Sequence, residues 1–310
     1  MQIIQSTLPL YKFTIHIQAT SPISFYNFPG IALRGGFGWM LKLQTCLEKD
    51  RTSCKGCQFI LHCPYASIFE SHNVGDIEVM KEATNFPHPF VMSPLVQWPS
   101  TIKPGESFTV YLSIFGEAIK YFHFFVKALK ALGQRGLGKE KSKFVVTEIT
   151  NYHNGDKLYT ANEGYVGENI EGLYINHDVV TGLQINFLTP CHIKYNGAII
   201  TEPTLNVIIK NILRRYKIIS NIYGDSSVIY TEDDINYDSI KVVDVHTEWY
   251  STDRLSKRQN RIMKIEGFTG SMNVQGDISA LYNILKIGEA IHLGKHTSFG
   301  CGLMKVNSLN

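Results

Sequence analysis

Residues 277–307 read DISALYNILKIGEAIHLGKHTSFGCGLMKVN, and this stretch decides the fold. Apolar residues recur at helical spacing over residues 277–291, which predicts a helix. Glycines crowd residues 294–302, and residues 303–307 then have the composition of a final strand. A helix, a glycine loop and a strand in this order form the closing part of a βαββαβ unit.

The same alternation of predicted strands and helices extends towards the N-terminus from this stretch. It occurs a second time in the first half of the chain. In the second half it predicts strands over residues 182–188, 240–250 and 262–274 and a helix over 203–222. In the first half it predicts strands over 11–18, 107–115 and 144–150 and helices over 31–47 and 117–132. A proline-rich loop region around residues 87–104 and a polar stretch over 151–180 are the expected irregular parts.

The expected fold class is therefore α+β, with two tandem ferredoxin-like domains. We expect the first domain at residues 1–178, with a cysteine-rich insertion at about 46–70, and the second at 179–310. Glycines at positions 35, 36 and 38 lie in the first turns of the first predicted helix. They predict a close approach of backbone or ligand there.

The composition excludes several classes of protein. The 310 residues include 30 Lys and Arg against 27 Asp and Glu, and 44% are hydrophobic, which is enough apolar material for sizeable cores. Charged residues make up only 18%, too few for a long disordered chain. No apolar run reaches the roughly 18 residues of a membrane helix, and the N-terminus lacks the features of a signal peptide. We therefore expect a cytoplasmic protein without a membrane partner.

Four of the six cysteines lie close together, with the spacing C-x7-C-x2-C-x5-C. Disulfides are disfavoured in a reducing compartment, and four thiolates can surround one tetrahedral zinc ion. This predicts a structural zinc site and no catalytic metal, with an iron–sulfur cluster or unmetallated cysteines as alternatives. The expected ligands are Cys46, Cys54, Cys57 and Cys63, with His62 as an alternative ligand. Cys191 and Cys301 are expected to be buried small hydrophobes.

Three basic segments are candidates for phosphate or RNA binding. Residues 294–302 place Lys and His among three glycines after a helix, which can present backbone amides beside basic side chains. Residues 133–143 carry four basic residues against one acid, and residues 249–264 carry five against one after two aromatics. Solvated loops and helix caps would explain the same residues without RNA. The residues assigned to RNA binding are Arg135, Lys139, Arg254, Lys257, Arg258, Arg261, Gly294, Gly300 and Gly302.

Short motifs along most of the chain resemble those of a known family. The first half carries Leu33-Arg34-Gly35-Gly36-Phe-Gly38, Cys54-x2-Cys57-x5-Cys63-Pro-Tyr65 and Pro87-His-Pro-Phe90-Val91. The second half carries Phe187-x-Thr189-Pro190, Arg258-Gln259, Gly267-Phe-Thr-Gly270 and Gly294-Lys295-x-Thr297-x-Phe299-Gly300-x-Gly302. In their order and spacing these motifs resemble the CRISPR-associated endoribonucleases of the RAMP superfamily that process precursor crRNA. The cysteine insertion is similar to that of one branch.

This resemblance implies metal-independent cleavage of CRISPR repeat RNA. The 2′-hydroxyl next to the scissile bond attacks the phosphorus, and the products carry a 2′,3′-cyclic phosphate and a 5′-hydroxyl. Such a reaction needs a base, an acid and cations near the phosphate, and histidine suits the first two roles because it titrates near neutrality. Many family members carry a catalytic histidine on or near the first helix, whereas this chain has none between His16 and His62.

We therefore expect the C-terminal glycine loop to supply the chemistry. His296 is the expected general acid or base, and Lys295 and Arg34 are expected to stabilise charge. His292 and Tyr26 complete the predicted catalytic set, although His292 equally fits a role at the end of its helix.

The missing histidine keeps an alternative function open. The chain would then be a non-catalytic RNA-binding RAMP subunit that holds crRNA in an effector complex. In both cases the resemblance implies CRISPR repeat RNA or crRNA as the partner, and other CRISPR effector subunits as further partners.

Overall fold

The computed structural model describes residues 8–70, 86–167, 169–173, 179–224, 237, 239–256 and 261–309. The chain divides into an N-terminal unit, Leu8–Leu173 with Ile222–Gly224, and a C-terminal unit, Tyr174–Asn221 and Asp225–Asn310 with Met1–Thr7. The division thus follows Leu173, whereas the sequence predicts a boundary at residue 178. Within the described ranges, no helix has both the length and the apolar character needed to cross a membrane.

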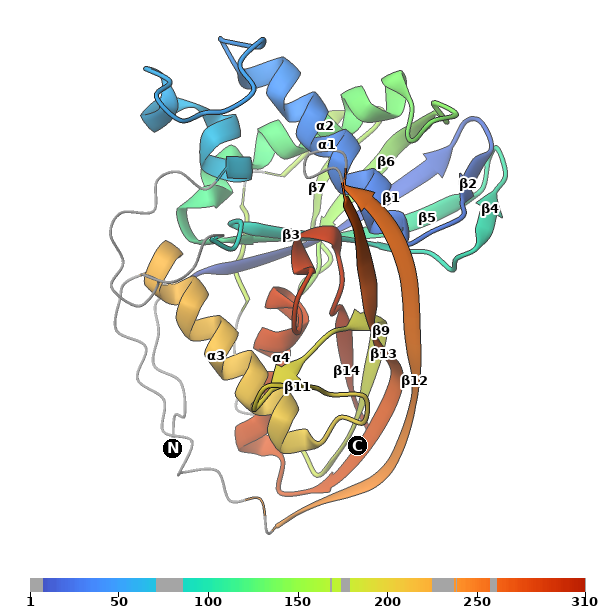
Figure 1. Cartoon of the computed structure of the whole chain (residues 1–310), viewed down its shortest axis with the longest axis vertical. Coiled ribbons are helices and arrows are strands. Elements are labelled where there is room, and N and C mark those ends of the chain that lie inside the picture. Colours follow the sequence, from blue (N-terminus) through green and yellow to red (C-terminus); the bar gives the residue numbers. More distant parts are fainter. Residues whose placement is uncertain are drawn as a thin grey trace. The chain divides into compact units, whose positions relative to one another are not determined.

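The N-terminal unit contains a six-stranded antiparallel sheet with the order β3-β5-β1-β6-β7-β8 (Figure 1). Phe13, Ile15 and Ile17 of β1 are buried, because alternate residues of a strand share one face of the sheet. A separate ribbon joins β2 (Ile23–Phe25) to β4 (Ser100–Ile102). The strands of the sheet are β1 (Leu10–Ala19), β3 (Phe90–Leu95), β5 (Ser107–Phe115), β6 (Phe144–Asn151), β7 (Lys157–Thr160) and β8 (Gly164–Tyr165).

Two helices, α1 (Pro29–Thr45) and α2 (Phe122–Arg135), share one core with β1 and β5. The rings of Phe37 and Phe125 stack with centroids 5.2 Å apart. A Cβ atom on Gly36 would lie 2.6 Å from Leu132 Cδ1, and one on Gly38 would lie 2.3 Å from the Phe69 ring. Gly36 and Gly38 therefore leave room for the side chains of Leu132 and Phe69. The close approach predicted near the start of this helix is made by these core side chains.

The proline-rich region is not a plain loop, and this part of the prediction is wrong. It contains β3 and β4, because Phe90, Val91 and Met92 are buried against the sheet. β3 lies at the edge of the sheet and accommodates Pro94, since an edge strand has one side without ladder hydrogen bonds. The polar stretch after residue 151 likewise contains β7 and β8.

The C-terminal unit contains a four-stranded antiparallel sheet with the order β12-β13-β9-β14 (Figure 1). Its chain order is β9-α3-β12-β13-α4-β14, so the sheet order is second, third, first and fourth strand. The N-terminal unit has the same order of strands and helices along the chain, β1-α1-β3-β5-α2-β6. The four strands also have the same order in the sheet, β3-β5-β1-β6. The elements are β9 (Gly182–Cys191), α3 (Leu205–Tyr223), β12 (Ile240–Ser256), β13 (Arg261–Gly276), α4 (Ser279–Ile291) and β14 (Met304–Ser308), with a short ribbon of β10 (Lys194–Tyr195) and β11 (Ala198–Ile199).

The strands β12 and β13 form a hairpin that is longer than the sequence predicts. Their pairing continues to Ser256 opposite Arg261, so most of the predicted exposed segment at residues 249–264 is strand. Of the RNA-binding residues predicted there, Arg254 and Arg261 lie on these two strands, while Lys257 and Arg258 lie outside the described residues. The first half of β12 contains a bulge between Val242 and Asp244.

Candidate functional site

The segment Gly294–Gly302, called the glycine loop below, follows α4 and is hydrogen-bonded to the end of β9. The hydroxyl of Thr189 donates to Gly300 O (2.8 Å) and accepts from the Leu303 amide (2.8 Å). The amide of Lys295 donates to the carbonyl of His192 (2.9 Å). The Thr189-Pro190 motif and the glycine loop therefore form one scaffold, although they are far apart in the sequence.

The backbone amides of the glycine loop serve this scaffold. The expectation that the loop presents its amides to a phosphate is wrong for five of them, which donate to oxygens of the protein. The loop is a hydrogen-bonded frame that presents side chains, with Lys295 exposed and His296 half-buried. The five amides are those of Gly294, Lys295, Phe299, Gly300 and Gly302.

Gly302 is the position at which the frame tolerates no side chain. Its φ is +74°, and a Cβ atom would lie 1.9 Å from Leu293 O, whose own amide donates to Gly302 O. Gly294 is similar, because its φ is +69° and a Cβ atom would lie 2.3 Å from His192 O. Glycine is required at both positions, since an L-residue would combine a strained backbone with a clash.

We expect Gly302→Ala to destabilise the C-terminal unit by about 3 kcal/mol or more, since backbone clash adds to the cost of a left-handed residue. Gly197→Ala is the matched control, because Gly197 has a φ of +85° with no atom within 4 Å of an added Cβ. That variant should lose only about 1 kcal/mol. Urea unfolding followed by tryptophan fluorescence measures both, and equal losses would show that the clash with Leu293 is relieved without cost.

Two histidines meet beside the glycine loop. The rings of His192 and His296 pack edge-on with centroids 5.9 Å apart, and the ring of Trp249 lies 6.5 Å from that of His192. His192 is only 7% exposed, and its Nδ1 lies 3.8 Å from Glu266 Oε1. The backbones of His192 and Lys295 form an isolated β-bridge, which fixes the distance between the two residues.

The surroundings of His192 favour its neutral form. Burial lowers the pKa of His192 below its usual value, and the Lys295 ammonium lowers it further, while Glu266 acts in the opposite direction. His192 therefore stays neutral at pH 7 beside an exposed cation.

His192 is the functional candidate that sequence reasoning missed. The available signal was its position, two residues after Pro190 in a motif that resembles the family. By contrast, His292, which the sequence places in the catalytic set, is 1% exposed, and its Nδ1 lies 3.1 Å from Cys301 O. This contact matches the other role considered for His292, at the end of α4, and its catalytic role stays a prediction.

The predicted site residues of the first half lie in the N-terminal unit. Arg34 on α1 donates from Nη2 to His88 Nε2 (2.8 Å) and lies 4.4 Å from the centre of the Phe69 ring. Tyr26 is 74% exposed before α1. Arg135 and Lys139 are exposed at the end of α2 and in the turn that follows, where Leu137 and Ser142 form a bridge. These four residues belong to the N-terminal unit, whereas His192 and His296 belong to the C-terminal unit. The roles of the four residues stay predictions.

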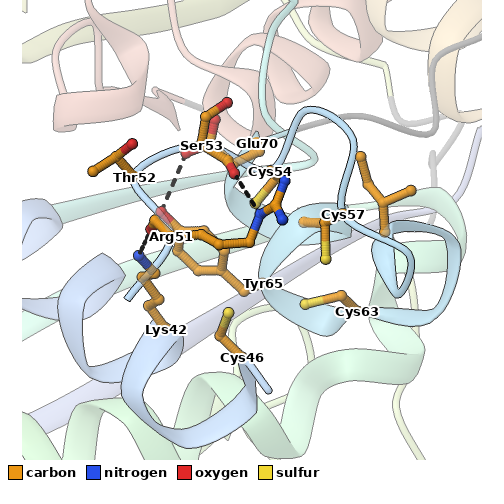
Figure 2. Close-up of a pocket in the computed structure, with 12 residues that line it drawn as sticks. Lys42, Cys46, Arg51, Thr52, Ser53, Cys54, Cys57, Cys63, Tyr65 and Glu70 are labelled. Atoms are coloured by element: carbon orange, nitrogen blue, oxygen red, sulfur yellow. Dashed lines mark hydrogen bonds between the residues drawn. The ribbon is translucent and has the colours of Figure 1, made fainter. Parts of the chain in front are cut away.

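The four clustered cysteines line one pocket of the N-terminal unit (Figure 2). Burial raises the pKa of Cys54 to about 11, and the charges of Glu70 and of the other three thiols add to this shift. Across the described residues, no three Cys, His, Asp or Glu side chains already stand in positions that could hold a metal ion. The metal site stays a prediction, whereas the predicted burial of Cys191 and Cys301 is confirmed at 0% and 1% exposure.

Comparison with known families identifies both halves of the chain. Residues 8–171 match the family model of the AF_1859_N N-terminal domain, and residues 185–304 match that of the CRISPR-associated endoribonuclease Cas6. An uncharacterised protein of Archaeoglobus fulgidus is 28% identical over 291 residues, which cover 91% of this chain and 92% of that protein.

Solved structures show the same fold. Thermus thermophilus Cas6 superposes with a TM-score of 0.57 at 12% identity over 98% of this chain and 100% of that chain. A Cas6 product complex gives a TM-score of 0.56 at 14% identity over 96% and 100%. A partial Cas6-RT-Cas1–Cas2 complex gives 0.57 at 10% identity over 99% of this chain and 47% of that chain. The chain therefore belongs to the family of the AF_1859_N N-terminal domain, and its residues 185–304 match the model of the CRISPR-associated endoribonuclease Cas6.

Proposed function

We propose that this protein is an endoribonuclease that cleaves CRISPR repeat RNA into mature crRNA. Cas6 is a family of endoribonucleases, and the proposal extends that activity to this chain. The observation that carries it is the grouping of His296, Lys295 and His192 at the glycine loop of the matching domain. The shared strand order of the two units supports a tandem ferredoxin-like architecture.

In the proposed reaction the 2′-hydroxyl oxygen attacks the adjacent phosphorus, and the bond from phosphorus to the 5′ oxygen breaks. The products are a 2′,3′-cyclic phosphate and a 5′-hydroxyl, and no metal ion takes part. His296 is reachable from solvent and moves a proton, either from the 2′ oxygen or to the leaving 5′ oxygen. The exposed ammonium of Lys295 stabilises the negative charge that develops at phosphorus.

His192 has a different role in this proposal. It is almost fully buried, so RNA reaches His296 and Lys295 first. His192 is therefore a positioning residue that supports the His296 ring and, being neutral, adds no second cation beside Lys295. Its carbonyl, which accepts the Lys295 amide, fixes the loop at the same point.

RNA binding is proposed at basic residues of both units and at the glycine loop. Other CRISPR proteins are proposed as partners, because a Cas6 domain occurs within the Cas6-RT-Cas1–Cas2 complex. The residues proposed to contact RNA are Arg135, Lys139, Arg254, Lys257, Arg258 and Arg261. Arg34 and Tyr26 stay in the proposed catalytic set.

A second function, a non-catalytic subunit that holds crRNA, is favoured by one observation. The first helix, Pro29–Thr45, carries no histidine. The two functions share RNA binding and differ only in the chemical step.

The test is incubation of the protein with labelled repeat RNA in the presence of EDTA. We expect one cut in each repeat, with a cyclic phosphate at the new 3′ end. Lys295→Ala should slow the cut by about tenfold or more, since it removes charge stabilisation, while Lys305→Ala, an exposed lysine on β14, should leave it unchanged. Tight binding without cleavage selects the non-catalytic subunit, and absence of binding overturns both functions.

A further inference from the structure

The pocket that contains the clustered cysteines is built at the end of α1 in the N-terminal unit. Cys46, Cys54, Cys57 and Cys63 all line it, and none of them forms a disulfide. Figure 2 shows the four side chains around the same space, with Cys46 coming from the end of α1 and the others from the segment that follows. Four thiols in one pocket are the donor set that zinc prefers in structural sites.

Short-range hydrogen bonds hold the four cysteines in place. The amide of Cys46 donates to Lys42 O (2.9 Å) at the end of α1. The amide of Cys57 donates to Cys54 O (3.1 Å) across a turn in which Gly56 has a φ of +72°. Cys63 accepts at its carbonyl from the Ser67 amide (3.0 Å). The thiols thus come from three local turns and not from one regular element.

The segment that carries three of these cysteines has little apolar material to hold it against the core. Its 3₁₀ helix, Ile60–His62, buries no residue. Leu47 is 75% exposed, Leu61 70% and Phe59 38%. A short segment that buries so little apolar surface needs another source of stability, and a metal ion is one that small folded segments use.

The charges around the pocket suit a metal bound by four thiolates. Such a site has a net charge of −2, and the side chains of Lys42 and Arg51 line the same pocket. The ammonium of Lys42 donates to Arg51 O (2.5 Å), and the Arg51 guanidinium donates to Lys55 O (3.0 Å). Glu70 opposes this balance, and it accepts from the Tyr65 hydroxyl (3.2 Å).

We propose that Cys46, Cys54, Cys57 and Cys63 bind one structural zinc ion that fastens this segment to the end of α1. In the described parts of the chain the thiols do not yet stand at coordination positions. Zinc binding therefore draws the four sulfurs together, to about 2.3 Å from the ion in a tetrahedron. The exposed turns around Gly56 allow this movement at little cost. The site takes no part in RNA cleavage, because four thiolates leave no open position for a substrate.

The experiment is metal analysis of the full-length protein purified without added metal. We expect about one zinc per chain, and cobalt substitution should give the thiolate-to-metal absorption of a tetrahedral site. The double variant Cys54→Ser/Cys57→Ser should retain less than about a tenth of the zinc, since two of four ligands are lost. Cys301→Ala is the matched control and should keep the full amount, because Cys301 is buried in the other unit.

A second measurement covers the case in which the double variant does not fold. Alkylation of the native wild-type protein should modify the four clustered thiols at least about tenfold faster after the zinc is chelated, since metal-bound thiolates are protected. Protein that contains iron in place of zinc, that contains no metal, or whose cysteines pair as disulfides would overturn the proposal. RNA cleavage by the wild type does not enter this test, so the zinc site and the proposed function can fail separately.

Discussion

Repeat RNA that carries a 2′-deoxy nucleotide immediately before the scissile bond will be cleaved at least about 10³-fold more slowly than ordinary RNA. The deoxy nucleotide lacks the oxygen that attacks phosphorus in the proposed reaction. An oriented nucleophile within the substrate acts at an effective concentration of about 10⁵–10⁸ M, which water at roughly 55 M does not approach. Binding should stay nearly unchanged, because one hydroxyl among many backbone contacts is lost.

Single-turnover rates with end-labelled RNA measure this effect, and a binding assay at the same salt concentration checks affinity. The matched control carries the deoxy nucleotide one position after the cut and should be cleaved at the ordinary rate. If the first RNA is cut as fast as the unmodified one, water is the nucleophile and the proposed chemistry is wrong. The assay in EDTA should be short, with the zinc content measured afterwards, so that loss of a structural ion is not mistaken for a catalytic requirement.

His296→Ala will reduce the single-turnover rate by about 10²–10⁴-fold, because proton transfer by a positioned side chain contributes that much. The fall should appear in the chemical step, with the affinity for repeat RNA changed little. His16→Ala is a suitable control, since His16 is a half-buried histidine on β1 of the other unit. A His296→Ala variant that cleaves within about threefold of the wild-type rate would assign the proton transfer to another residue.

His192→Asn tests the positioning role and should cost only about tenfold in rate, less than His296→Ala. The lowered pKa of His192 also predicts a stability signature with a definite sign. The folded protein keeps His192 neutral while the unfolded chain protonates it, so His192 contributes stability above its usual pKa of about 6.5. That contribution disappears as the pH falls through the lowered pKa.

Melting temperatures of the wild type and of His192→Asn are measured between pH 7.5 and pH 5. Loss of packing alone would lower the melting temperature of the variant without changing how it depends on pH. The wild-type protein should lose stability over this range, and His192→Asn should lose less, because it has no imidazole to protonate. Parallel slopes for the two proteins would show that His192 does not titrate in the folded state as proposed.

The elements with a clear apolar pattern could be predicted from the sequence. Alternation at Phe13, Ile15 and Ile17 predicts β1, and the apolar stripes of α2 and α4 predict both helices. The strands β3 and β4 could not be found in the same way. Prolines at positions 94 and 99 indicate a loop when only local propensity is considered, whereas Pro94 lies in an edge strand paired with β5 and Pro99 lies just before β4.

The candidate site was predicted only in part. The spacing of Gly294, Lys295 and Gly302 identified the loop, because glycines that crowd after a helix require special backbone conformations. His192 escaped notice because its link to the loop is a backbone pairing with Lys295, and its position two residues after Pro190 does not reveal that pairing. The loop amides were misjudged for a related reason, since three of the five acceptors lie outside the loop, namely the carbonyls of Pro190 and His192 and the side chain of Asn211.

The bulge near the start of β12 has a consequence for the behaviour of the protein in concentrated solution. β12 forms an edge of its sheet and exposes Val242, Val243 and Val245, a composition that favours pairing between the edges of two molecules. The bulge between Val242 and Asp244 breaks the regular row of hydrogen-bonding groups, and the Asp244 carboxylate lies 2.7 Å from His246 Nε2 there. Irregular backbone and the Asp244 charge therefore protect this valine-rich edge from aggregation.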